Sequence, residues 1–296
     1  MPKAAAVDTP SHGQVVDFIS GWPNPVRAAI SRRFPAGIQA GAEPLLMNSP
    51  EPAFAHGFNL GAHVGDAVGR VVEHRSFYAR AIRSRPVWLN QVHEKAVLNL
   101  DHLTDEEIVG LDQSIQSDHA RQRATADACF TTQPGRACTI MFADCLAVLL
   151  AHSSGQIVGA AHAGWRGLAG GVLGALLEEM KTNCPSGSVG NQWLAWLGPC
   201  IGPAYFEVGP EVVEAMVSAG LPARTTPGRG DRVYLNLQDL AFEALHQAAR
   251  RLEVGVEVLG RDPRCTYSDE VACFSHRRDG RSGRMAASIW VSDEAK

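Results

Sequence analysis

The sequence has no long apolar run, no block of basic residues and no closely spaced cysteine pair. No stretch reaches the roughly 18–20 apolar residues that a membrane-spanning helix needs, so we expect no membrane partner. The formal net charge is −4 and the basic residues are scattered, which argues against nucleic acid as a partner. The 7 cysteines are odd in number and none are in Cys-x-x-Cys spacing, which argues against a disulfide framework.

Two further absences concern targeting and copper. The first residues lack the charged segment and apolar core of a secretory signal peptide, so we expect a cytoplasmic, reducing location. The 11 histidines include no His-x-His pair. Since a multicopper oxidase centre needs many histidines in such pairs, the sequence argues against a multicopper centre.

The composition is that of an ordinary globular protein, with 45% apolar and 20% charged residues over 296 positions. Strand-like and helix-like segments alternate without a repeat or a break in composition. The sequence therefore predicts one α/β domain over residues 21–296 after a poorly ordered extension over residues 1–20. Residues 101–123 are polar, and we predict an irregular excursion or lid there. The predicted strands are 28–31, 87–92, 126–131, 137–142, 193–197 and 286–291, and the predicted helices are 68–82, 172–180, 210–219 and 237–252.

The central segment, residues 143–171, predicts a β-hairpin. Apolar runs at 146–151 and 157–161 flank the turn formers Ser-Ser-Gly at 153–155. A turn centred near 154 pairs position 145 with 162 or 163, and paired side chains on one face have Cβ atoms about 4.5–5.5 Å apart. We therefore expect the Cys145 thiol and the His162 imidazole to meet at the open end of the hairpin.

A third polar side chain, His93, ends the predicted strand 87–92. Two imidazoles and a thiolate are a known ligand set for catalytic zinc and leave a fourth position for water or substrate. The alternative is that Cys145 is a packed cysteine, as most free cysteines are, and that His93 and His162 are ordinary polar groups at strand ends. The spacing alone leaves both interpretations open.

Two charged neighbours of the hairpin allow similar pairs of interpretations. Asp144 precedes the thiol and either makes a structural hydrogen bond or orients a ligand. Arg166 lies just before a predicted helix, where a guanidinium and free N–H groups together form an anion site; it is otherwise a surface arginine.

Six motifs occur in one order along the chain, and together they resemble the bacterial laccase-domain family, historically called polyphenol oxidases. Members of this family are now regarded as purine nucleoside phosphorylases with adenosine deaminase activity. The resemblance extends from about residue 28 to residue 291. The motifs are Asn59-Leu60-Gly61 with His63-Val64-Gly65-Asp66, Gln91-Val92-His93, Ala143-Asp144-Cys145, His162-Ala163-Gly164-Trp165-Arg166-Gly167, Leu197-Gly198-Pro199-Cys200-Ile201-Gly202 and Phe274-Ser275-His276-Arg277-Arg278-Asp279.

The resemblance implies a single domain of αββα layers with mixed sheets. It also implies a zinc-dependent phosphorylase of adenosine or inosine, with guanosine and methylthioadenosine as further substrates to test, and an associated adenosine deaminase activity. Its partners would be a purine nucleoside and phosphate, and the chain would be a monomer or a homodimer.

The resemblance also implies roles for particular residues. His93, Cys145 and His162 would be both the zinc ligands and the catalytic residues, and Asn59, Arg75 and Arg166 would contact the ligand. Four departures from the family pattern leave the substrate preference open. Glu94 replaces a frequent glycine, His276 a usual tyrosine, and His74 the asparagine that usually precedes Arg75, while the early Ser-Thr-Arg followed by Gly-Gly is replaced by Ser31-Arg32-Arg33-Phe34-Pro35-Ala36.

Three other functions compete with this one. In a metal-free hydrolase of a peptide or cell-wall amide, Cys145 would be the nucleophile and His162 the base, with Asp144 or another group orienting the imidazole. A polyphenol oxidoreductase is the second, and a non-enzymatic binding module, in which zinc only ties the hairpin to the His93 strand, is the third. Metal content and an open fourth coordination position distinguish them.

Overall fold

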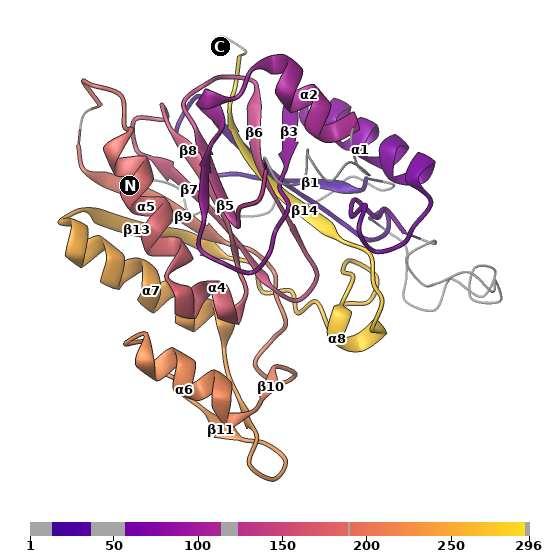
Figure 1. The fold of residues 1–296 in the computed structure, drawn as a ribbon, viewed down its shortest axis with the longest axis vertical. Coiled ribbons are helices and arrows are strands. Elements are labelled where there is room, and N and C mark those ends of the chain that lie inside the picture. Colours follow the sequence, from indigo (N-terminus) through magenta and orange to yellow (C-terminus); the bar gives the residue numbers. More distant parts are fainter. Residues whose placement is uncertain (1–13, 37–56, 114–123, 189, 294–296) are drawn as a thin grey trace.

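Two large β-sheets pack face to face and carry helices on both outer faces (Figure 1). The structure, a computed structural model, describes residues 14–36, 57–113, 124–188 and 190–293. The arrangement confirms the predicted α/β class with αββα layers and mixed sheets. No helix in these described ranges is long and apolar enough to cross a membrane.

The first sheet has five strands in the order β1-β2-β14-β6-β3. All its neighbours are antiparallel except β3 and β6, which are parallel. The central strand β14 is buried along its whole length, as expected for a strand covered on both faces. The strands are β1 (Val16–Ile19), β2 (Val26–Ser31), β14 (Met285–Val291), β6 (Arg136–Phe142) and β3 (Arg85–Trp88).

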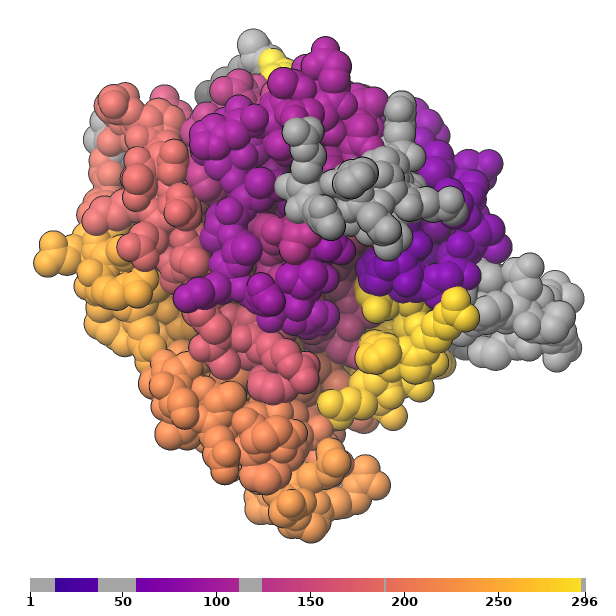
Figure 2. All heavy atoms as spheres, viewed as in Figure 1, coloured from indigo at the N-terminus to yellow at the C-terminus, as the bar shows by residue number. Residues whose placement is uncertain are grey.

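The second sheet has six strands in the order β13-β9-β7-β8-β5-β4. Its centre is the predicted hairpin, β7 and β8, in which nearly all side chains are apolar and all are buried. The strands are β13 (Gly255–Arg261), β9 (Gln192–Leu197), β7 (Leu146–His152), β8 (Val158–Ala163), β5 (Ala128–Thr131) and β4 (Val97–Asn99). A small third sheet, β10 (Glu207–Val208), β12 (Val233–Tyr234) and β11 (Thr226–Pro227), lies at the lower end of the molecule with α6 (Figure 2).

The helices cover the two outer faces. Helix α1 packs its buried residues on the first sheet, whereas α4, α5 and α7 pack on the second. Helix α7 begins where the Asn236 side chain accepts N–H bonds from Gln238 and Asp239, an N-cap that satisfies two otherwise unpaired donors. The helices are α1 (Val68–Ile82), the 3₁₀ helix η2 (Leu100–His102), α2 (Asp105–Gln113), α4 (Trp165–Gly170), α5 (Val172–Thr182), α6 (Pro210–Ser218), α7 (Leu237–Leu252) and α8 (His276–Asp279).

Three of the four segments that pass from one large sheet to the other lie at the same end of the sandwich, whereas the fourth, between β5 and β6, lies at the opposite end. The chain crosses between β3 and β4 and again between β6 and β7, and it returns from β13 through α8 to β14. The strand registers place all three crossings at the same end, because β3 and β6 both finish there while β7 and β14 both begin there. His93 lies on the first crossing and Cys145 on the second.

The structure corrects several predicted elements. The expected extension over residues 1–20 contains an edge strand, β1, while residues 1–13 lie outside the described residues. The strand predicted over 87–92 ends at Trp88, so His93 lies in the turn that follows it. The expected irregular excursion over 101–123 contains helix α2, which lies beside the start of β6, where Arg136 donates to Asp105; residues 114–123 lie outside the described residues.

Candidate metal centre and cavity

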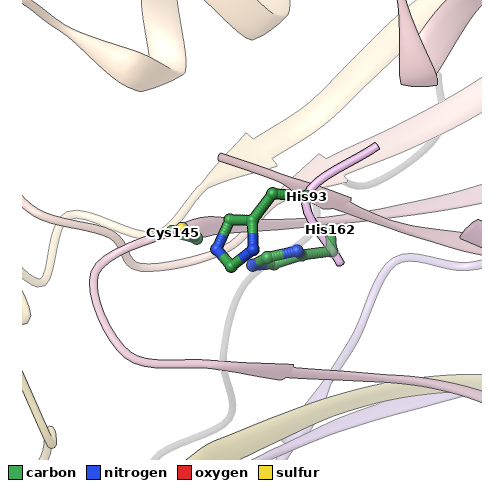
Figure 3. Close-up of side chains that lie close together, drawn as sticks. All are labelled: His93, Cys145 and His162. Atoms are coloured by element: carbon green, nitrogen blue, oxygen red, sulfur yellow. The ribbon is translucent and has the colours of Figure 1, made fainter. Parts of the chain in front are cut away.

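The structure brings together His93, Cys145 and His162, which lie far apart in the sequence. One ligand atom from each residue lies within 4.8 Å of the others. The imidazole rings of His93 and His162 stand edge to face with centroids 4.7 Å apart, and the Cys145 sulfur lies beside them (Figure 3). His162 is buried, Cys145 is half-buried and His93 is exposed, so the group opens on one side.

The hairpin positions Cys145 and His162 differently from the sequence prediction. The register pairs Leu146 with Ala163 and Ala147 with His162, so Cys145 lies opposite Gly164 rather than opposite 162 or 163. Because side chains two residues apart on a strand share one face, Cys145 and His162 are still diagonal neighbours. A glycine is needed at 164, since a Cβ there would lie 2.8 Å from the Cys145 sulfur.

A carboxylate that the sequence analysis did not single out, Asp127, connects the two histidines. It lies just before β5, and its Oδ1 lies 2.8 Å from Nδ1 of His162. The backbone N–H groups of Val92, His93 and Glu94 donate to the same carboxylate at 2.8–3.0 Å. His93 has φ 65°, a left-handed conformation that is uncommon outside glycine, and the Asp127 bonds hold the turn in it.

The three titratable groups shift one another's pKa values. Burial opposes ionisation of the Cys145 thiol, but the charge and hydrogen bonds of His162 and His93 outweigh it and lower the thiol pKa to about 6. Burial also opposes the charged form of His162, but Cys145 and Asp127 raise its pKa. Burial would raise the pKa of Asp127, but His162 and the backbone donors lower it. A thiolate is the form that binds a metal ion.

The donor set therefore suits a metal ion. The Asp127 carboxylate accepts the proton on Nδ1 of His162, so Nε2 is the ring nitrogen that would give up its proton to bind a metal, an arrangement common for metal-ligating histidines. Two imidazole nitrogens and one thiolate leave a further coordination position. In this way the residues present form a possible His/Cys/His metal site.

A cavity of about 310 Å³ opens beside these residues. Three arginines line it, Arg166, Arg277 and Arg284, together with His63 and His276. Its apolar walls come from Met141, Phe142, Trp165, Ile201, Phe206 and Leu237. The cavity is thus apolar on several sides and cationic at several points, a combination that suits a planar molecule bound together with an anion.

Asp144 is part of the cavity wall, but its oxygens are occupied. Its Oδ1 accepts a 2.6 Å bond from the Thr266 hydroxyl, and its Oδ2 accepts a 2.6 Å bond from the Arg277 N–H. Its φ is 84°, and the next residue, Cys145, directly precedes β7. Of the two interpretations of Asp144, these contacts favour structural hydrogen bonding.

Of the three residues predicted to contact the ligand, one lines the cavity and two are buried away from it. Arg166 lines the cavity, exposed and 4.3 Å over the Trp165 ring. Asn59 is fully buried outside the lining and binds the backbone of Gly61 and Arg284. Arg75 is also buried outside the lining, where it donates to the Leu60 carbonyl.

Of the single-residue departures from the family pattern, only one lies at the cavity. His276 lines the cavity, so this substitution reaches the ligand space. Glu94 is exposed and contributes its N–H to Asp127, and His74 bonds the Asn59 carbonyl through Nδ1; neither lines the cavity.

The sequence contained one signal for Asp127. It is an isolated acid in the apolar segment Ala126 to Phe130, where a solvated carboxylate has no place. Arg284 carried no such signal, because its place in the cavity depends on Asn59, whose Oδ1 accepts the Arg284 N–H at 2.8 Å.

The fold and the site define a two-sheet αββα protein with a possible cysteine–histidine metal-binding group at the end of the sandwich where the chain passes between the sheets. The chain belongs to the family described as multi-copper polyphenol oxidoreductase laccase, whose model matches residues 48–292. The resemblance seen in the sequence motifs is therefore confirmed.

Similar proteins carry a more specific name. Purine nucleoside phosphorylase YfiH of Escherichia coli is 42% identical over 236 residues, covering 79% of this chain and 86% of that protein. A Pseudomonas aeruginosa protein named purine nucleoside phosphorylase is 37% identical over 280 residues, covering 92% and 97%. A Neisseria meningitidis crystal structure matches with a TM-score of 0.70 and 32% identity, covering 92% of this chain and 96% of that one.

Proposed function

We propose that this chain is a zinc-dependent purine nucleoside phosphorylase of adenosine or inosine, with an associated adenosine deaminase activity. The observation that carries the proposal is one cavity shared by the His93, Cys145 and His162 cluster and by three arginines, in a chain 42% identical to a protein of that name. Its volume of about 310 Å³ falls at the lower end of the range of ligand pockets, which suits a nucleoside.

The cationic residues support the phosphate part of the proposal. Arg284 is half-buried, and burial lowers the pKa of its guanidinium. It donates to the carbonyl oxygens of Ser282 and Gly283, and no ion pair joins it to a carboxylate among the residues that the structure describes. A half-buried guanidinium that makes no ion pair with a carboxylate favours an anionic ligand, and phosphate matches its two-pronged geometry. Arg166 and Arg277 add charge at the same cavity.

The apolar residues support the nucleoside part. The rings of Phe142, Trp165 and Phe206 line the cavity, and aromatic faces stack favourably on a purine. The His63 and His276 side chains at the wall can donate to ring nitrogens or to ribose hydroxyls.

The reaction balances without a redox partner. A phosphate oxygen forms a bond to the anomeric carbon of the ribose while the bond from that carbon to the purine nitrogen breaks, and the departing base takes up the proton that hydrogen phosphate loses. The arginines hold the phosphate for attack, and the aromatic walls hold the base and exclude water. A bound zinc would supply a Lewis acid at His93, Cys145 and His162 that stabilises negative charge and, for deamination, activates water.

We propose different roles for the six predicted site residues. His93, Cys145 and His162 are the zinc ligands and Arg166 contacts substrate. Asn59 and Arg75 act indirectly: Asn59 fixes the backbone of Arg284, and Arg75 supports the sheet through its stacking on Trp88 at 4.2 Å.

One observation favours a second function, the metal-free cysteine hydrolase. Cys145, His162 and Asp127 form a chain of thiol, imidazole and carboxylate, with His162 and Asp127 in contact at 2.8 Å. This is the order of groups in a nucleophile–base–carboxylate triad, with Asp127 rather than Asp144 as the orienting group.

The test incubates purified metal-replete protein with inosine, adenosine and guanosine, with and without phosphate. We expect phosphate-dependent release of the free base and ribose 1-phosphate, and conversion of adenosine to inosine independently of phosphate. Both products are followed by liquid chromatography, and bound metal by elemental analysis. Protein that binds zinc yet leaves all three nucleosides unchanged would contradict the proposal.

Two variants sharpen this test. Cys145→Ser removes the thiolate, so zinc content and phosphorolysis should fall together by at least tenfold. Cys184→Ser, at a half-buried thiol outside the cavity lining, should leave both unchanged. Stoichiometric zinc that blocks alkylation of Cys145 would exclude the cysteine hydrolase, and activity that survives full metal removal would favour it.

A further inference from the structure

Asp127 forms hydrogen bonds with both histidines of the candidate metal site, with the side chain of His162 and with the backbone of His93. Its side chain accepts four hydrogen bonds, one from Nδ1 of His162 and three from consecutive N–H groups at Val92, His93 and Glu94. The Asp127 side chain is fully buried, so each of these bonds replaces contact with water. It does not line the cavity and has no place among the ligand atoms.

The backbone of Asp127 is fixed as firmly as its side chain. Its carbonyl accepts the His162 N–H at 2.7 Å, and its N–H donates to the Ala96 carbonyl at 3.1 Å. The residue is therefore held between β8 and the segment that leads into β4. A carboxylate anchored on both sides can set the position of whatever binds it.

The contacts with the two histidines differ in kind. At His162 the carboxylate accepts the Nδ1 proton, so that Nε2 is the nitrogen left to bind a metal ion. At His93 it binds the backbone of a residue at φ 65°, a conformation that costs about 1–2 kcal/mol for a residue with a Cβ. Three converging N–H groups make an anion-binding concavity that offsets this cost only while a negative charge occupies it.

We propose that Asp127 is the positioning residue of the metal centre, orienting His162 through its side chain and His93 through its backbone turn. The proposal rests on the proposed function only in taking His93, Cys145 and His162 as metal ligands. It goes beyond that function in assigning to one carboxylate the geometry of two of the three ligands.

The test measures metal affinity rather than turnover. Asp127→Asn keeps the size of the side chain but replaces one acceptor oxygen by an NH₂ group, which faces N–H donors. We expect the dissociation constant for Co²⁺, used in place of Zn²⁺ for its visible spectrum, to rise about 10–100-fold. The absorption bands of the bound Co²⁺ should also shift, because the angle of the imidazole ligands changes.

Asp101 offers a matched control, because it binds the end of strand β5 whereas Asp127 lies just before the start of that strand. Asp101 accepts bonds from the side chain of Thr131 and from the N–H and hydroxyl of Thr132, just past the end of β5. Asp101→Asn removes the same charge from a similar set of donors, and should leave Co²⁺ affinity and spectrum as in the wild type. A purely structural role for Asp127 would make the two variants behave alike.

The outcomes separate this proposal from the proposed function. Wild-type affinity and spectrum in folded Asp127→Asn protein would overturn it, as would a wild-type chain that binds no Co²⁺. Loss of affinity in Asp127→Asn alone would support it even if no nucleoside is cleaved. If Asp127→Asn does not fold, Asp127→Glu takes its place, because it keeps the charge but moves it by one methylene, and the same loss of affinity is expected.

Discussion

The Cys145 sulfur has room in the cluster because residue 164 has no side chain. A Cβ at Gly164 would lie 2.8 Å from Sγ of Cys145 and 3.5 Å from Cδ2 of His93. Gly164 has φ −70°, so alanine fits the backbone and only the added methyl group matters. We expect Gly164→Ala to weaken metal binding about fivefold, since displacing a side chain from its rotamer costs about 1 kcal/mol. Competition with a chromophoric chelator measures the change.

Gly170 offers the control for this substitution. It is the last residue of the short helix α4, which Gly164 caps at the other end, and a Cβ there would meet no atom within 4 Å. Gly170→Ala should therefore keep full metal affinity. Equal affinities for the two alanine variants would mean that the thiol can move freely, and would contradict the tight approach described here.

At the level of single residues, the sequence predicted that His93, Cys145 and His162 come together, but it did not predict that Asp127 holds the two histidines. His93, Cys145 and His162 carry ligand chemistry that is visible in their side chains. Asp127 lies beside His93 only through backbone bonds, and no spacing rule predicts a left-handed turn at a histidine. The placement of Asn59 and Arg75 outside the cavity lining also depends on tertiary packing that a motif does not encode.

Helix α8 forms part of the cavity wall near Cys145, and hydrogen bonds to Asp144 hold it there. Asp144 accepts the N–H of Arg277 and the hydroxyl of Thr266, and Arg277 in turn donates to the Glu207 carbonyl. Asp144→Asn tolerates the positive φ but loses one acceptor oxygen. We expect the KM for nucleoside to rise several-fold and the free energy of unfolding to fall by roughly 2 kcal/mol, while metal content stays unchanged. Steady-state kinetics, urea melts and elemental analysis provide the three readouts.

An exposed carboxylate gives the comparison for Asp144. Asp239 pairs with Arg261 near the start of α7, outside the cavity lining. Asp239→Asn should change neither KM nor metal content. Loss of metal in Asp144→Asn would show that this residue acts on the ligands and not on the wall.

Elements with clear periodicity and end signals were predicted best. Helices α1 and α7 occupy the predicted residues, 68–82 and 237–252, because apolar residues recur on one face and Asn236 caps the second. The hairpin exists as predicted, but its register is shifted because the pairing is centred between Ser154 and Gly155. Helix α2 was missed because its acidic first turn and Gly110 resemble a loop.

The two sheets are joined at one edge by a buried ion pair, which is a property of the whole molecule. Asp17 on β1 accepts bonds from Arg32 and from Arg264, which follows β13, so the edge strands of both sheets share one carboxylate. Asp17 is 2% exposed. Asp17→Asn weakens the compensation of two half-buried guanidinium groups, although Arg264 keeps its pair with Asp262, so we expect the free energy of unfolding to fall by about 2 kcal/mol. Urea denaturation followed by tryptophan fluorescence measures it.

A surface pair provides the reference value. Arg251 and Glu178 join α7 to α5 at 3.1 Å, but both side chains are more than half exposed. Arg251→Ala should cost no more than about 1 kcal/mol. If Asp17→Asn costs no more than this, the edge contact does not hold the sheets together.

The layered arrangement as a whole followed from the family motifs, but not from local patterns. Alternating strand and helix signals predict an α/β class, yet they do not say which strands share a sheet. The pairing of β14 with β2 and β6 joins residues more than a hundred positions apart. A single domain over residues 21–296 stays a prediction.

His93 and Cys145 each lie on a segment that leaves one sheet and enters the other, and His162 is fixed within the second. A metal ion bound by all three would therefore cross-link the two large sheets as well as take part in the reaction. Sliding one sheet over the other would pull its ligands apart. Metal bound only by the folded chain raises the melting temperature, so chelators should loosen this end of the protein first.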